Sequence, residues 1–156
     1  MGSEALSAAL EREHREIDEG IESFAAMAEG RADTTPLKRA MEGLRRHIYL
    51  EEEFLFPPLR AAGLMAPVFV MLREHGEIWR TMDALDAAVA RNLADRRVRE
   101  LCTELLERLD RHNSKEEPIL YPQADSVLTP EATGRLREFL ASGRLPDGWV
   151  CRQMEA

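Results

Sequence analysis

Hydrophobic residues recur at every third or fourth position along most of this chain, which is the period of an α-helix with one buried face. The pattern predicts four long helices and a shorter fifth one, so the expected fold class is all-α. From Gly143 onward the periodicity is lost. The predicted helices cover residues 3–29, 35–62, 67–93, 95 to the prolines at 118 and 122, and 129–140.

Residues that start or stop helices separate these segments. Ser3 is a good N-cap for the first helix, and Thr35 is the expected cap of the second, with Pro36 at its first helical position. Pro118 and Pro122 should kink or end the fourth long helix, because proline has no backbone N–H to donate. Thr129 is the expected cap of the short fifth helix, and Gly63 and Gly30 are expected to end the second and first.

Short connections between the long helices make an antiparallel up-down-up-down four-helix bundle, with a short extra C-terminal helix, the simplest topology. A length of 156 residues suits one compact core better than two. We therefore expect a bundle domain over residues 1–141 and an irregular tail over 142–156. Because the tail has no helical period, we expect it to pack loosely or not at all.

The composition favours a cytoplasmic protein. No segment approaches the roughly 20 apolar residues of a membrane span, and the N-terminus lacks a signal-peptide pattern. The two cysteines, Cys102 and Cys151, do not form a disulfide framework, and Cys102 is interpreted as a packing residue. The net charge of -8 argues against nucleic acid and anionic membranes as partners.

The chain has four histidines, and one falls in the apolar stripe of each long helix. Two of them begin an HxxxE motif, in which the histidine and the glutamate lie one turn apart on the same helix face. At a rise of about 1.5 Å per residue, all six residues fall in a layer roughly 15 Å thick. These candidate metal ligands are His14, His47, Glu51, His75, His112 and Glu116.

Burying six ionisable groups without partners would cost about 1 to 3 kcal/mol each, against a total stability of roughly 5 to 15 kcal/mol. A metal centre removes this cost, and buried histidine–glutamate hydrogen bonds are the alternative explanation. Imidazole and carboxylate together suit iron and would also accept manganese or zinc. An ExxH motif of the ferritin type occurs only once, at Glu11–His14, which disfavours a ferritin-like site.

The spacing H…HxxxE…H…HxxxE resembles the HHE cation-binding family, the hemerythrin-like proteins, over about residues 10–125. The run at 51–57, Glu74 before His75, and the residues at 116–118 and 121–122 support the resemblance. It implies an antiparallel four-helix bundle around two non-haem iron ions bridged by carboxylates, with an oxo bridge also allowed. The implied ligands are His14 and His47 on one iron, His75 and His112 on the other, and Glu51 and Glu116 as bridges.

The chain departs from the oxygen-carrying members of that family at one position. These carriers have a second histidine one turn after the third-helix histidine, where this chain has Trp79. The missing ligand is expected to be water, an exogenous molecule, or an oxygen donor from the chain. The open position would have apolar walls. The candidate donors are Tyr49, Tyr121, Glu52 and Asp18, and the candidate walls are Trp79, Phe54, Ile78 and Met82.

The resemblance implies a protein that binds a small diatomic ligand such as O2 or NO, or peroxide, for sensing, scavenging or storage. A di-iron catalase or peroxidase is the enzymatic alternative. A third possibility is an iron-sensing interaction protein whose tail is exposed or hidden according to metal content. Glu51 is the only expected ligand in the run Glu51–Glu53, and Asp18 is expected to point toward solvent.

Overall fold

The computed structural model describes residues 4–27 and 33–154, and all its regular elements within these ranges are helical. The Ser3 cap, Glu29 and Gly30 lie outside the described residues. The elements are α1 (Leu6–Ala25), α2 (Thr35–Leu50), the π-helical turn η1 (Glu51–Leu55), α3 (Phe56–Ala61), α4 (Met65–Arg91), α5 (Arg96–Ile119), α6 (Tyr121–Val127), α7 (Pro130–Ser142) and the 3-10 turn η2 (Arg152–Met154).

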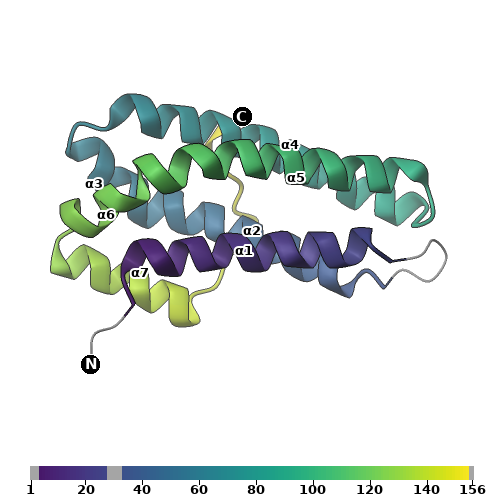
Figure 1. Cartoon of the computed structure of the whole chain (residues 1–156), viewed down its shortest axis with the longest axis horizontal. Helices are drawn as coiled ribbons and strands as arrows, with labels where there is room; N and C mark the ends of the chain where they lie inside the picture. The colour runs from purple at the N-terminus through teal and green to yellow at the C-terminus, as the bar shows by residue number, and fades with distance from the viewer. Residues whose placement is uncertain (1–3, 28–32, 155–156) are drawn as a thin grey trace.

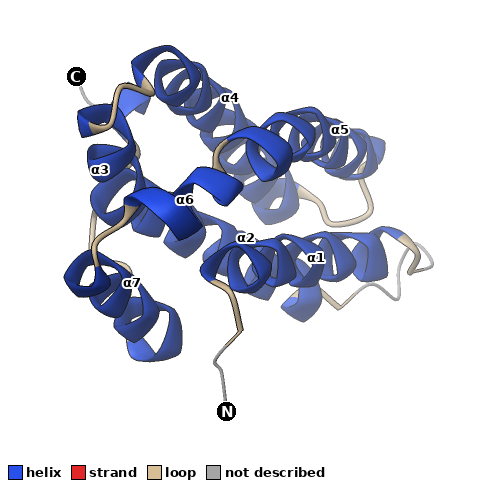
Figure 2. Ribbon diagram, turned by 60° about the vertical axis from the view of Figure 1, so that its left-hand side comes forward, coloured by secondary structure: helices blue, strands red, loops and turns tan. Residues whose placement is uncertain are grey.

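The long helices α1, α2, α4 and α5 lie side by side along the long axis of the molecule (Figure 1). Helix α1 packs along α2 and α4 along α5, and α1 also contacts α5. The short helices α3, α6 and α7 gather at one end of the bundle (Figure 2). The all-helical class and the bundle-like packing predicted from the periodicity are thus confirmed.

The interior of the bundle contains two hydrophobic clusters with a polar layer between them. Helices α1 and α4 each pass from one cluster to the other, and in both of them the histidine lies between the two apolar stretches. In α1, for example, Leu10 belongs to one cluster and Ile17 to the other, and His14 lies between them. The same holds in α4 for Leu72 and Ile78, which flank His75.

The second long helix changes its winding where its HxxxE motif ends. Residues Glu51–Leu55 form a π-helical turn, closed by the Phe56 N–H donating to the Glu51 carbonyl. Pro57 and Pro58 follow, and neither has an N–H to continue an α-helical ladder across this turn. π-Turns inside helices are frequent at functional sites. Here the turn leaves Glu51 fully buried and the side chain of Glu52 almost so.

Gly63 ends this helix, as predicted, because its backbone has φ +99°, which a residue with a Cβ rarely adopts. The N–H of Leu64 donates to the Leu59 carbonyl and that of Gly63 to the Arg60 carbonyl, the pattern of a Schellman cap. At the other end, Thr35 lies inside the helix and is not its cap. The Asp33 carboxylate accepts hydrogen bonds from the N–H and the hydroxyl of Thr35.

The expected helix ends near the prolines and threonine are confirmed. Helix α5 ends at Ile119, directly after Pro118, and Pro122 lies in the first turn of α6. The Thr129 side chain accepts a hydrogen bond from the Ala132 N–H at the start of α7. Among the described residues, none of the helices combines the length and apolar character that crossing a membrane requires.

The expectation of a loosely packed tail is wrong. Residues 143–151 have no regular helix, yet Cys151 is completely buried. The Trp149 ring lies 5.0 Å from the Tyr49 ring and 5.7 Å from the Trp79 ring, centroid to centroid. The tail carries its large apolar side chains at irregular spacing. Such a segment can bury them against a bundle although no period reveals it.

Candidate metal centre

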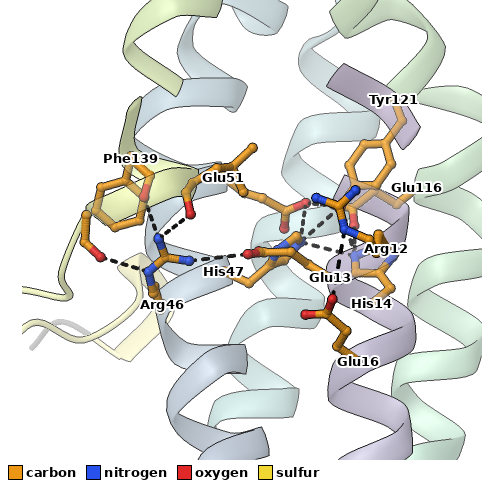
Figure 3. Close-up of polar contacts among 12 residues, drawn as sticks. Arg12, Glu13, His14, Glu16, Arg46, His47, Glu51, Glu116, Tyr121 and Phe139 are labelled. Atoms are coloured by element: carbon orange, nitrogen blue, oxygen red, sulfur yellow. Dashed lines mark hydrogen bonds and ion pairs between the residues drawn. The ribbon is translucent and has the colours of Figure 1, made fainter. Parts of the chain in front are cut away.

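The structure brings all six sequence-predicted residues together in the polar layer. Each of them is at most 5% exposed. They form two groups of four in which the possible ligand atoms lie within 4.8 Å of one another, and Glu51 and Glu116 belong to both groups. Figure 3 shows the first group, with its side chains directed toward one another. The groups are His14, His47, Glu51 and Glu116, and Glu51, His75, His112 and Glu116.

The two shared carboxylates each present one oxygen to each group. In Glu51, Oε2 lies 3.2 Å from His47 Nε2 and Oε1 lies 3.0 Å from His75 Nε2. In Glu116, Oε1 lies 3.2 Å from His14 Nε2 and Oε2 lies 3.5 Å from His112 Nε2. A carboxylate placed this way can bind two cations, one with each oxygen.

The histidines face the centre with Nε2, and each uses Nδ1 for a second, outer carboxylate on a neighbouring helix. Because an ionised carboxylate only accepts hydrogen bonds, Nδ1 carries the proton in each pair. This arrangement orients the ring with Nε2 inward, where a metal ion would displace the proton that Nε2 carries in the metal-free protein. The Nδ1 to oxygen distances are 2.8 Å for His47–Glu13, 2.8 Å for His75–Glu52, 2.9 Å for His112–Glu74 and 2.7 Å for His14–Glu117.

These outer carboxylates link the four helices into a closed ring. Helix α1 supplies the carboxylate for α2, the π-turn after α2 supplies one for α4, α4 supplies one for α5, and α5 supplies one for α1. Sequence reasoning did not assign them this role. The available signal was that each one directly precedes or follows a candidate ligand in the chain. The four residues are Glu13, Glu52, Glu74 and Glu117.

The carboxylates control the charge of the histidines. Burial alone would lower the pKa of His112, but Glu116 and Glu74 outweigh it and raise that pKa to about 10. Burial likewise opposes ionisation of Glu116, yet His112 and His14 hold the pKa of this carboxyl well below its ordinary value. The pKa of His47 is raised well above its ordinary value, because Glu51 and Glu13 outweigh its burial. Without metal, protonated histidines therefore balance the two buried carboxylates, and a bound cation would take the place of those protons.

Glu116 tests whether these residues fit a metal. Both of its oxygens are buried, and neither accepts a well-formed hydrogen bond from any residue that the structure describes. A buried carboxylate without such partners is costly unless a cation neutralises it. The donors around it are imidazole nitrogens and carboxylate oxygens, the set that suits iron, manganese and zinc. The residues present therefore fit bound metal, and each of the two groups could hold an ion.

Tyr121 adds a donor to the first group only. Its hydroxyl donates to Glu51 Oε2 at 2.7 Å and lies 2.8 Å from His14 Nε2 and 3.0 Å from His47 Nε2. Complete burial, followed by the nearby Glu116 and Glu51 charges, raises the pKa of this phenol well above its ordinary value. The phenol therefore keeps its proton in the metal-free protein.

The other candidates for the missing ligand lie elsewhere. Glu52 contacts the outer nitrogen of His75, and Tyr49 packs against the Trp149 and Phe139 rings. Asp18 is half-buried rather than solvent-facing, and its Oδ1 accepts no hydrogen bond from the described residues. Burial raises the pKa of Asp18 to about 6. Of the four candidates, only Tyr121 lies within hydrogen-bonding distance of the histidine Nε2 and glutamate oxygen atoms that face the centre.

The expected apolar walls are only partly where they were predicted. Ile78, Trp79 and Met82 are buried in the hydrophobic cluster next to the polar layer. Phe54 instead packs on the Phe139 ring at 5.3 Å, on the α7 side of the π-turn. The Arg45 guanidinium lies 5.3 Å from the Trp79 ring centre, so this side chain is held between a cation and Trp149.

Comparison with known protein families matches residues 5–124 to the Hemerythrin HHE cation binding domain. The match includes every residue of the two candidate groups and Tyr121, and it ends before α7. Neither the curated proteins nor the solved structures compared with the chain include a significant match. With the family pattern spanning most of its length and the six buried residues gathered in one layer, the chain belongs to the hemerythrin HHE cation-binding domain family.

Proposed function

We propose that this protein is a non-haem di-iron protein that binds O2, NO or peroxide for sensing, scavenging or storage. Its fold is then the antiparallel up-down-up-down bundle of four long helices. The observation that carries the proposal is the sharing of Glu51 and Glu116 between two groups of buried histidines. In this assignment the first iron takes His14 and His47, and the second takes His75 and His112. Glu51 and Glu116 bridge the two ions.

Bound iron would supply redox-active coordination positions at which a diatomic molecule or peroxide can bind. The chain's own residues prepare the surroundings of that position. The two hydrophobic clusters exclude water from both sides of the polar layer. The outer carboxylates hold each imidazole with Nε2 inward, and the Tyr121 hydroxyl holds a proton beside Glu51 Oε2.

The test is the metal content and optical spectrum of protein purified without added metal or chelator. About two irons per chain with near-ultraviolet absorption from iron would support the proposal and direct ligand tests to O2, NO and peroxide. Two manganese or zinc ions per chain would support the two-metal site but would show that the metal is not iron. A folded, metal-free protein that also refuses added iron would contradict the proposal.

Peroxide consumption is the second candidate, favoured by Tyr121. A buried phenol that keeps its proton can donate it to a reacting oxygen within hydrogen-bonding reach. Steady turnover of peroxide by the iron-loaded protein would favour an enzyme over a binding protein. Stoichiometric binding without turnover would favour the first function.

A further inference from the structure

Arg46 connects one outer carboxylate to the C-terminal part of the chain. Its Nη1 lies 3.2 Å from Oε2 of Glu13, the carboxylate whose other oxygen holds His47. On its opposite side, Nε donates to the Gly143 carbonyl at 2.9 Å and Nη2 to the carbonyls of Leu140 and Phe139. The guanidinium also lies 4.8 Å from the Phe139 ring centre (Figure 3). The end of α7 is thereby tied to His47 through two side chains.

Glu52 makes the equivalent connection to His75. Its Oε2 lies 2.8 Å from His75 Nδ1, and its Oε1 accepts a hydrogen bond from the backbone N–H of Arg152 at 2.9 Å. Next to His75, a Cβ added at Gly76 would lie only 2.7 Å from the Cβ of Gln153. The chain therefore passes directly over α4 beside the histidine.

Residues 139–154, which we call the strap, run from the end of α7 across to α4 (Figure 1). The strap is anchored at both ends to outer carboxylates, and these serve one histidine of each group. Trp149 and the completely buried Cys151 hold its middle against the bundle. The strap lies wholly outside residues 5–124, the part of the chain that matches the family.

We propose that the strap is a positioning element of the metal centre. It fixes Glu13 through Arg46 and Glu52 through the Arg152 N–H, and these carboxylates fix the imidazoles of His47 and His75. Because such linkage is reciprocal, metal in the centre tightens the strap, and a docked strap strengthens metal binding, which we expect to appear as slower metal release. The inference rests on the proposed function in one respect, namely that the two groups bind metal.

The first experiment compares two substitutions at one position. Arg152→Pro deletes the N–H that Glu52 accepts, and proline is tolerated at the start of a helical turn. Arg152→Ala keeps that N–H and removes only the exposed side chain, so it is the matched control. Proteins loaded anaerobically with Fe(II) are mixed with a chelator, and iron release is followed. Release should be at least about tenfold faster in Arg152→Pro than in wild type, and unchanged in Arg152→Ala.

The second experiment tests the other anchor. Arg46→Gln removes the connection between Glu13 and the end of α7, and Arg108→Gln removes a comparably exposed arginine that pairs with Glu77 on another helix. Faster iron release is expected in Arg46→Gln only. The two anchors are independent, so either one suffices if the other variant does not fold.

The third experiment follows the strap itself. Trypsin should cleave after Arg144 more slowly in the iron-loaded wild type than in the iron-free protein, and Arg152→Pro should remove this difference. Three results together would overturn the strap proposal alone. The wild type binds about two irons, both variants release iron at the wild-type rate, and cleavage after Arg144 is the same with and without iron. Wild type that binds no iron overturns the proposed function as well.

Discussion

The Tyr121 hydroxyl donates a hydrogen bond to Oε2 of Glu51, the oxygen that also faces His47. The phenol comes from α6, which begins only two residues after α5 ends. Its ring stacks on the His14 ring with the centroids 5.3 Å apart. The two halves of the centre are therefore unlike, because one of them contains a phenol and the other does not. The expected shortage of ligands lay on the third-helix side, but the phenol is on the opposite side.

Tyr121→Phe keeps the ring and removes the hydroxyl. We expect the variant to load the same amount of iron and to change the optical spectrum or the reaction with peroxide, because the proton donor beside Glu51 is gone. The lost hydrogen bond should cost about 1 kcal/mol of stability. Iron content, spectra and peroxide consumption measured side by side check this. Identical spectra and peroxide reactivity would show that Tyr121 is only a core residue.

Glu51→Gln or Glu116→Gln should lower bound iron below the wild-type amount, because each carboxylate faces both groups and a neutral amide is a poor bridge. Metal analysis after dialysis gives the stoichiometry. Glu53→Gln is the control, since this neighbouring carboxylate is exposed and belongs to neither group. Wild-type stoichiometry in both bridge variants would refute the bridging roles.

Asp18→Asn should stabilise the iron-free protein at about pH 7.5. The pKa of Asp18 is raised to about 6 by burial, so the folded protein binds this proton more tightly than the unfolded chain does. Its contribution to stability is present below the unfolded value of about 3.9 and is lost as the pH rises through about 6. The gain should be on the order of 1 kcal/mol, because water screens a half-buried group.

The difference in melting temperature between Asp18→Asn and wild type should therefore shrink at about pH 4. Glu19→Gln is the control, because this carboxylate is exposed on the same helix. A gain at low pH equal to that at neutral pH would mean that burial of the charge is not the cause.

Both cysteines should be unreactive toward thiol reagents in the native protein at about pH 8. Burial raises the pKa of Cys102 to about 11, and burial with the nearby Glu52 charge raises that of Cys151 to about 12. The thiolate, which is the reactive form, is therefore scarce. Titration before and after denaturation should give no thiols and then both. Rapid reaction of Cys151 in the native protein would indicate that the strap opens there.

The sequence by itself determined the long helices and the direction in which the HxxxE motifs face. A period of three to four residues is a local property, and it places His47 and Glu51, or His112 and Glu116, on one face whatever the helix packs against. That local information also predicted that the six residues share a layer, because helix lengths and short connections limit their relative heights.

Only the tertiary structure decided which carboxylate orients which histidine. Glu13 neighbours His14 in the chain but serves His47, because the pairing depends on the rotation and spacing of packed helices. Tyr121 and the strap follow helix breaks, where no period relates one side chain to the next. Trp149 and Cys151 could therefore be placed only by contacts between segments distant in sequence, which local spacing does not encode.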